Sequence, residues 1–172
     1  HKFGMSMEKS GVFTSVMPFA TLIFTPLFGM FIDRKGRAAT LMIFGSLALL
    51  LVHLSFAYTY IPPIIPMIFL GAAFSLIPAT MWPSMVKLVD DRIIGTAYGL
   101  MYSIQNLGLF VFPILAGYIL DVSNPGNPEK LDYTATMTMF VVLSLMGVVF
   151  ALLLKRQDAK HGYGMELPLN RK

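Results

Sequence analysis

Charge is scarce in this sequence, and cysteine is absent. Asp, Glu, Lys and Arg make up 13% of the 172 residues, whereas a soluble domain carries about 25%. A chain with so little charge cannot cover a globule with polar surface in water, so a soluble fold is excluded and lipid is expected to surround most of the chain. The absence of cysteine also excludes disulfides, thiolate catalysis and Cys-ligated metals.

The distribution of the basic residues disfavours nucleic acid as a partner. Lys and Arg number 13 against 9 Asp and Glu, and the formal net charge is +4. These basic residues alternate with long apolar runs and do not form one basic face. We therefore predict that they flank membrane spans and that the protein has no nucleic-acid partner.

Runs without charged residues predict an all-α integral membrane fold with five transmembrane helices. A bilayer core of about 30 Å needs roughly 20 apolar residues in a helix, and a charge within that length is costly. Aromatic residues and prolines at Tyr58–Pro63 divide the longest charge-free stretch in two. Residues 1–10 are expected to form an external loop after a missing helix, and 155–172 a cytoplasmic tail. The expected spans are 11–32, 38–57, 61–86, 93–120 and 133–154.

The Lys and Arg residues also predict the orientation of the spans. One side carries only Lys2, Lys9 and Lys130, whereas the other side carries all the rest. Because basic loops stay in the cytoplasm, the richer side and the C-terminus are expected there. We predict a multi-pass protein of the bacterial inner (plasma) membrane. The richer side holds Arg34, Lys35, Arg37, Lys87, Arg92, Lys155, Arg156, Lys160, Arg171 and Lys172.

The first and fourth spans end in the same pattern. Gly29 and Asp33 match Gly117 and Asp121 in a Gly-x-x-x-Asp sequence, and each copy has a proline a few residues upstream. The copies lie three spans apart and therefore cross the membrane in opposite directions, as an inverted repeat requires. The alternative, a chance recurrence in glycine-rich membrane helices, stays open.

The first copy continues into a longer motif, Gly29-x-x-x-Asp33-Arg34-x-Gly36-Arg37. Here the sequence resembles the major facilitator superfamily of secondary transporters, whose signature loop has this pattern between helices two and three and between helices eight and nine. The resemblance implies that the five spans are helices eight to twelve, from the C-terminal six-helix half. The missing N-terminal helices of the same transporter would then be a partner. The odd number of spans and the lack of an initiator Met also lead us to expect a piece of a longer protein.

A narrower resemblance rests on three short segments of the third and fourth spans. These segments are similar to the branch of the family that contains the lysosomal dipeptide uniporter and its bacterial relatives. The resemblance implies alternating access, by symport or uniport, with dipeptides or similar small polar solutes as substrates. The segments are Trp82-Pro83-Ser84, Gly95-Thr96-Ala97-Tyr98-Gly99 and Gln105-Asn106-Leu107-Gly108.

The residues of the motif predict a conformational latch. Gly29 allows a neighbouring helix to approach closely, and the Asp33 carboxylate can accept hydrogen bonds from a helix N-terminus. Arg34 and Arg37 can pair with that carboxylate or with the phosphates of membrane lipid. We predict that these residues, with Gly36, hold one state closed. Family resemblance implies that the partner of Asp33 lies in the other half of the transporter, and a plain turn with positive-inside charges is the alternative.

The fourth span carries a polar face near mid-depth, where transporters place their sites. Four of its side chains fall within an arc of about 100° on a helical projection. The third span contains two prolines that should bend it and adds two further cavity groups. Amides suit a zwitterionic or amide-bearing solute, although helix-to-helix packing is the alternative role. The candidate substrate-binding residues are Tyr98, Tyr102, Gln105, Asn106, Ser75 and Trp82.

The sequence offers no sign of catalysis, a cofactor or a metal. We find no pair of catalytic groups, such as two Asp residues or a Ser with a His, placed at depth in the spans. His53 is the one side chain within a span that normally titrates near neutral pH, and we favour a plain interfacial histidine over a proton carrier. We therefore predict a transporter and not an enzyme. A non-transporting membrane scaffold or partner-binding segment would explain the spans but not the motif, and is the alternative function.

Overall fold

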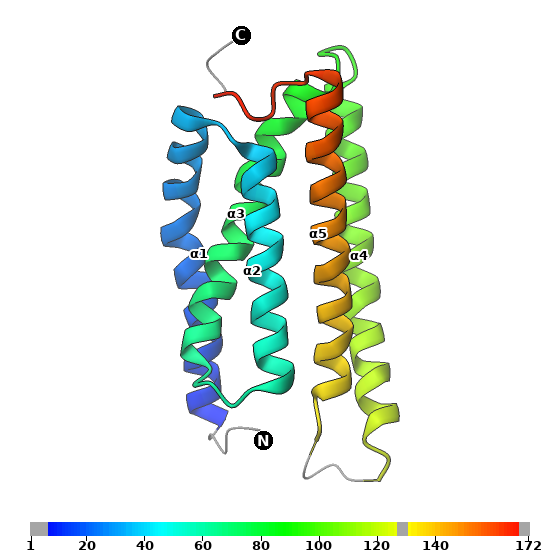
Figure 1. Cartoon of the computed structure of the whole chain (residues 1–172). Coiled ribbons are helices and arrows are strands. Elements are labelled where there is room, and N and C mark those ends of the chain that lie inside the picture. The colour runs from blue at the N-terminus through cyan, green and yellow to red at the C-terminus, as the bar shows by residue number, and fades with distance from the viewer. Residues whose placement is uncertain (1–6, 127–130, 169–172) are drawn as a thin grey trace.

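The computed structural model describes residues 7–126 and 131–168, and these residues form five α-helices and no strand (Figure 1). Each helix contains a window long and apolar enough to cross a membrane. This confirms the predicted all-α membrane fold. The helices are α1 (Met7–Lys35), α2 (Ala38–Tyr58), α3 (Ile64–Leu88), α4 (Ile94–Ser123) and α5 (Thr134–His161).

Helices α1 and α5 extend well beyond the apolar runs that predicted them, whereas α3 begins at Ile64, after the two prolines that were expected to open its span at residue 61. Helix α1 begins at Met7, within the segment expected to be a loop, and α5 continues to His161, within the expected tail. Charges are costly in lipid but not in a helix that has left the hydrocarbon, so the helical hydrogen bonds continue past the span. Gly162 then ends α5 with a left-handed φ of 70°, as glycine commonly does after a helix. The expected loop residues 1–6 lie outside the described residues.

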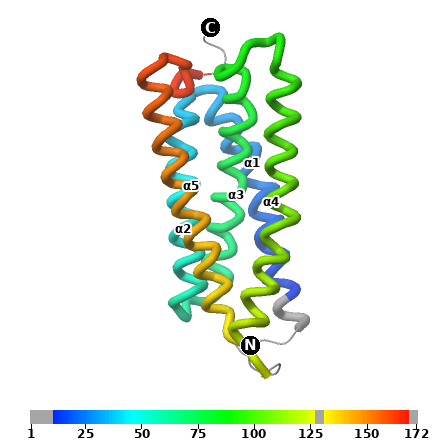
Figure 2. Tube along the Cα trace, turned by 90° about the vertical axis from the view of Figure 1, so that its right-hand side faces the viewer, coloured from blue at the N-terminus to red at the C-terminus, as the bar shows by residue number. Residues whose placement is uncertain are grey.

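The bundle consists of a packed group of helices and a loosely attached one. Helix α2 packs extensively against α5 and α3, and α3 packs extensively against α1. Helix α4 makes few contacts, and most of them are with α5 and α3. Figure 2 shows α4 and α5 separating from their connected lower ends toward the top.

Small residues make the close contact between α1 and α3. A Cβ atom added to Gly71 would lie 2.5 Å from the Cβ of Ala20 and 2.7 Å from the carbonyl oxygen of Met17. Ser75, one turn further along α3, donates a hydrogen bond to its own helix at Gly71 (2.7 Å) and approaches the Thr21 carbonyl oxygen of α1 (3.3 Å). Close backbone approach between small residues is the usual way in which membrane helices gain packing energy.

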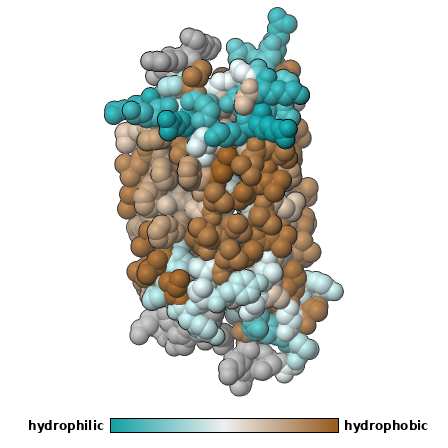
Figure 3. All heavy atoms as spheres, viewed as in Figure 1, coloured by the Kyte–Doolittle hydropathy of each residue, from teal (hydrophilic) through white to brown (hydrophobic). Residues whose placement is uncertain are grey.

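The surface has the arrangement expected of a membrane protein. Figure 3 shows a band of apolar side chains between two polar ends. Helices α1 and α4 run in opposite directions through this band (Figure 1), which an inverted repeat requires. Of the basic residues used to predict orientation, Lys2, Lys130, Arg171 and Lys172 lie outside the described residues, as does the side chain of Lys9.

Candidate functional site

Three of the six predicted substrate-binding residues meet in one aromatic cluster between α3 and α4. The Trp82 ring lies 5.7 Å from the Tyr98 ring and 4.2 Å from the Tyr102 ring, measured between centroids. The Tyr98 hydroxyl donates a hydrogen bond of 2.9 Å to the carbonyl oxygen of Trp82. This aromatic cluster (Trp82, Tyr98 and Tyr102) is therefore a substantial part of the limited contact between the two helices.

The local sequence explains why these side chains meet. Tyr98 and Tyr102 are four residues apart in α4, so they lie one above the other on the same face of the helix. Trp82 and Tyr98 are half-buried, whereas the Tyr102 side chain is 53% exposed. The aromatic cluster thus has one open side, on which a solute could stack.

The two predicted amides lie beyond the open side of the cluster along α4. Gln105 and Asn106 are both exposed. The Asn106 amide nitrogen donates a hydrogen bond of 2.8 Å to the Tyr102 carbonyl oxygen of its own helix. Gln105 makes no hydrogen bond to any residue that the structure describes.

No residue of α4 is buried within the described part of the chain, even though this helix is apolar enough to span a membrane. Amides placed in hydrocarbon without partners cost several kcal/mol. The Gln105 amide and the amide oxygen of Asn106, whose nitrogen is already bonded to Tyr102, must therefore face water, a solute or polar groups from outside the described chain. The geometry provides one open polar surface that continues from an aromatic one.

Ser75 lies apart from this surface. Its side chain is fully buried between α3 and α1, where its hydroxyl is occupied by the hydrogen bond to Gly71. The structure therefore gives Ser75 a packing contact and does not bring it to the other five candidate residues.

The residues predicted as a latch lie at the end of α1 and in the turn to α2. Asp33, Arg34 and Arg37 are exposed, and Asp33 forms no ion pair with the described residues. Apart from the backbone of its own helix, no described atom lies within 4 Å of a Cβ atom added to Gly29, so no other described helix makes the close approach predicted there. Gly36 and Arg37 adopt left-handed φ angles of 71° and 62°.

The contacts that surround this turn were not predicted from the sequence. Residues 155–172 are expected to form a tail, yet Met165 and Glu166 contact the beginning of α2. The available signal was an apolar methionine a few residues after Gly162, in a segment otherwise expected to be polar.

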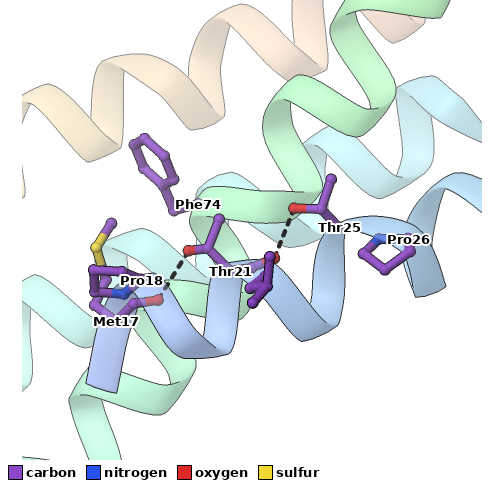
Figure 4. A pocket seen from close by; sticks show the side chains of 7 residues that line it. Met17, Pro18, Thr21, Thr25, Pro26 and Phe74 are labelled. Atoms are coloured by element: carbon purple, nitrogen blue, oxygen red, sulfur yellow. Dashed lines mark hydrogen bonds between the residues drawn. The ribbon is translucent and has the colours of Figure 1, made fainter. Parts of the chain in front are cut away.

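A groove between α1 and α3 offers a different kind of surface (Figure 4). Its volume is about 630 Å³. The Thr21 and Thr25 hydroxyls in it donate to backbone carbonyl oxygens of their own helix, at 2.9 and 2.7 Å. Because the hydroxyls are occupied in this way, the groove is apolar and suits a helix or lipid better than a polar solute. Its walls are Met17, Pro18, Thr21, Leu22, Thr25, Pro26 and Phe74.

His53 joins two helices. Its Nδ1 atom lies 2.7 Å from the Ser144 hydroxyl of α5, and its ring stacks 5.6 Å from the ring of Phe140. Ser144 in turn donates to the Phe140 carbonyl oxygen. A polar link of this kind stabilises helix packing in a membrane. Among the described residues, His53 included, no group of three or more His, Cys, Asp or Glu side chains is placed to hold a metal ion.

Comparison with known proteins gives consistent matches. The family described as Major Facilitator Superfamily matches residues 1–165. Curated relatives are named lysosomal dipeptide transporter MFSD1. The mouse protein is 36% identical over 155 residues, covering 90% of this chain and 32% of the relative. The human protein is 35% identical with the same coverage, and the Danio rerio protein is 39% identical over 121 residues, covering 70% of this chain and 26% of the relative. The chain thus spans about a third of these relatives' length or less.

Proposed function

The chain belongs to the major facilitator superfamily, and we propose that it supplies helices eight to twelve of a transporter that moves a small polar solute by alternating access. Relatives at 34–39% identity are named as dipeptide transporters, which supports a dipeptide or a similar molecule as the solute. Their names point to a transporter rather than an enzyme. They do not favour the alternative of a non-transporting scaffold.

The observation that carries the proposal is the open surface of α4 next to the aromatic cluster. Gln105 and Asn106 supply donors and acceptors that match a peptide amide, and the exposed Tyr102 ring supplies an apolar face. The rings can also receive an ammonium group through a cation–π contact. A dipeptide presents an amide, an ammonium group and side chains of varied polarity, so this surface fits the constant parts of the molecule.

The sparse packing of α4 supports movement as well as binding. Elements with few buried contacts open at the lowest free-energy cost, and no residue of α4 is buried among the described residues. The aromatic cluster couples α4 to α3, which is itself packed against α1 and α2, while α4 has few other contacts with the described chain. A solute that binds across this cluster would therefore influence how the two helices are arranged.

The charged ends of a dipeptide need partners that these spans do not provide. No Asp, Glu, Lys or Arg lies at mid-depth in the predicted spans. We propose that the opposite charges come from the missing N-terminal helices, which would close the other side of the cavity. Membrane lipid would contact the apolar band of Figure 3.

The family and the five apolar helices make the chain a multi-pass membrane protein. We further propose that its C-terminus is cytoplasmic, on the basis of the excess of Lys and Arg at that end. The bacterial plasma membrane stays a prediction, and the relatives named above are lysosomal. Subcellular fractionation of the source cells would decide between these membranes.

Uptake into liposomes that contain the full-length protein tests the function. Labelled dipeptides should accumulate, and an excess of unlabelled dipeptide should compete more strongly than free amino acids or sugars. A parallel series with and without a pH gradient tests whether uptake is coupled to protons. Absence of uptake for every solute class, with correctly inserted protein, would contradict the proposal.

A further inference from the structure

The chain turns back on itself after α5. Residues 162–168 leave the end of α5 and cross the same end of the bundle as the α1–α2 turn and the end of α3 (Figure 1). Two turn glycines, Gly162 and Gly164, have left-handed φ angles of 70° and 77° and allow this change of direction. We name residues 162–168 the strap.

The strap completes the beginning of α2. The first backbone N–H groups of a helix have no partner within it, and Arg37 makes no side-chain cap for α2. Instead, the Arg37 N–H donates to the Glu166 carbonyl oxygen and the Ala38 N–H to the Met165 carbonyl oxygen, both at 3.0 Å. The Glu166 carboxylate accepts from the Thr40 N–H at 2.8 Å. Because a carboxylate at a helix N-terminus is also favoured by the helix dipole, Glu166 acts as the cap of α2 from a distant part of the chain.

The strap is held in place by burial. The Met165 side chain is fully buried and packs with Ala39, Met42 and Ala151 of α2 and α5. The Met165 N–H donates a hydrogen bond of 3.0 Å to a carboxylate oxygen of Asp158, which is itself buried in α5. A fully buried apolar anchor distinguishes the strap from a solvated tail.

A lysine links the strap to α3. The Lys87 ammonium group donates to the carbonyl oxygens of Gly164 (2.9 Å) and Leu167 (2.6 Å). On the α5 side, Lys155 donates 2.7 Å to the Thr40 hydroxyl, which also meets the Glu166 carboxylate at 2.9 Å. Contacts from α2, α3 and α5 therefore converge on the strap.

The strap also explains a glycine of the signature motif. A Cβ atom added to Gly36 would lie 2.4 Å from the carbonyl carbon of Leu167 and 2.6 Å from the carbonyl oxygen of Glu166. Only glycine fits at position 36, because the φ angle is left-handed and because the strap backbone leaves no room for a side chain. The next residue, Arg37, has a φ that L side chains rarely adopt, and the hydrogen bond to Glu166 holds it there.

We propose that the strap is a positioning device that fixes the backbone of the α1–α2 turn, so that residues after the last helix set the conformation of the signature motif. The Glu166 cap, the buried Met165 and the Lys87 link are its three attachment points. When the strap leaves, the first turn of α2 loses its cap and the Gly36–Arg37 turn becomes free to change conformation. Release of the strap thus provides a way to loosen the cytoplasmic end of α1 while the helices stay inserted.

A cysteine placed under the strap tests the proposal in the full-length protein, with any cysteine outside this chain replaced. Ala39→Cys is a small change at a fully buried position next to Met165. Its thiol should react slowly with a water-soluble maleimide, and Glu166→Ala or Lys87→Met should accelerate labelling at least tenfold. Glu166→Gln, which keeps an oxygen acceptor for the Thr40 N–H, and Arg156→Ala, on an exposed residue of α5, are the matched controls and should leave the rate near that of the parent.

Limited trypsin digestion supplies the second measurement. Strap variants should be cleaved faster after Arg37, whereas cleavage after the exposed Arg92 in the α3–α4 turn should not change. Gly36→Ala, whose methyl group would clash with the strap backbone at Glu166 and Leu167, should likewise accelerate both thiol labelling and cleavage after Arg37. The proposal is overturned if the strap variants leave labelling of the Ala39→Cys thiol and cleavage after Arg37 unchanged, or if cleavage after Arg92 rises in parallel, because the second result indicates general unfolding.

Discussion

Trp82 shows how one side chain can organise a loosely packed region. Its ring contacts Tyr98 and Tyr102, and its backbone carbonyl accepts the Tyr98 hydroxyl. The single tryptophan therefore links the two helices that carry the candidate site, while leaving the amides of Gln105 and Asn106 exposed. The function that we propose therefore depends on these two exposed amides, which are accessible to a solute.

The amides provide the first prediction. Gln105→Ala and Asn106→Ala in the full-length protein should each weaken the apparent affinity for a dipeptide about fivefold, because one lost hydrogen bond is worth about 1 kcal/mol. Concentration-dependent uptake in liposomes measures the effect. Leu107→Ala, at an exposed apolar position of the same helix, is the control. Unchanged uptake by both amide variants would indicate that these residues pack against other helices and do not bind the solute.

The latch carboxylate provides the second prediction. Asp33 is exposed and forms no ion pair with the described residues, and we propose that its partner lies in the missing N-terminal helices. Asp33→Asn should reduce the maximal uptake rate about tenfold, as expected for loss of a charge-assisted hydrogen bond, and should change the apparent affinity less. Asp91→Asn in the exposed α3–α4 turn is the matched control. A loss of affinity with an unchanged maximal rate would refute the latch.

At the scale of the helices, α1 and α4 are opposite cases. Helix α1 is anchored to α3 through small residues and a backbone close approach, whereas no residue of α4 is buried within the described chain. Close packing resists movement because any displacement creates voids or clashes. We therefore expect α1 and α3 to move together and α4 to move relative to them.

Gly71 tests the packing of α1 on α3. Gly71→Ala places a methyl group against Ala20 and the Met17 carbonyl oxygen, so it should destabilise the chain by about 1–3 kcal/mol. Thermal unfolding in detergent, followed by helical circular dichroism, measures the change. Gly95→Ala in α4 meets nothing within 4 Å in the described chain and should not destabilise it. Equal stability of the two variants would show that α1 and α3 leave room for a methyl group at position 71.

For the whole molecule, the distribution of charge determines how the bundle lies in the membrane. The polar end that holds the strap and the α1–α2 turn (Figure 3) is the end that we expect in the cytoplasm. The strap joins α2, α3 and α5 at this end. The opposite end has the loop between α4 and α5, where Asn124 exchanges hydrogen bonds with Asp132.

Thiol labelling in intact cells tests the orientation, because this chain has no native cysteine. Lys35→Cys should be protected from a membrane-impermeant maleimide and become labelled only after the membrane is permeabilised. Pro125→Cys, at an exposed position in the loop between α4 and α5, should be labelled at once. The reverse pattern at the two positions would refute the predicted topology.

The sequence alone determined the five spans, the family motif and the polar face of α4. These features depend on the high cost of placing charge in hydrocarbon and on helical periodicity, and both act along the chain and are visible in its order of residues. The pairing of Trp82 with the two tyrosines, the burial of Ser75 and the strap were decided by the tertiary structure. They join residues far apart in sequence, as when Glu166 caps a helix that begins at Ala38, and such contacts depend on how the helices pack. The scarce charges flank the spans as expected, but only the folded chain shows that Lys87 and Glu166 also hold the last segment in place.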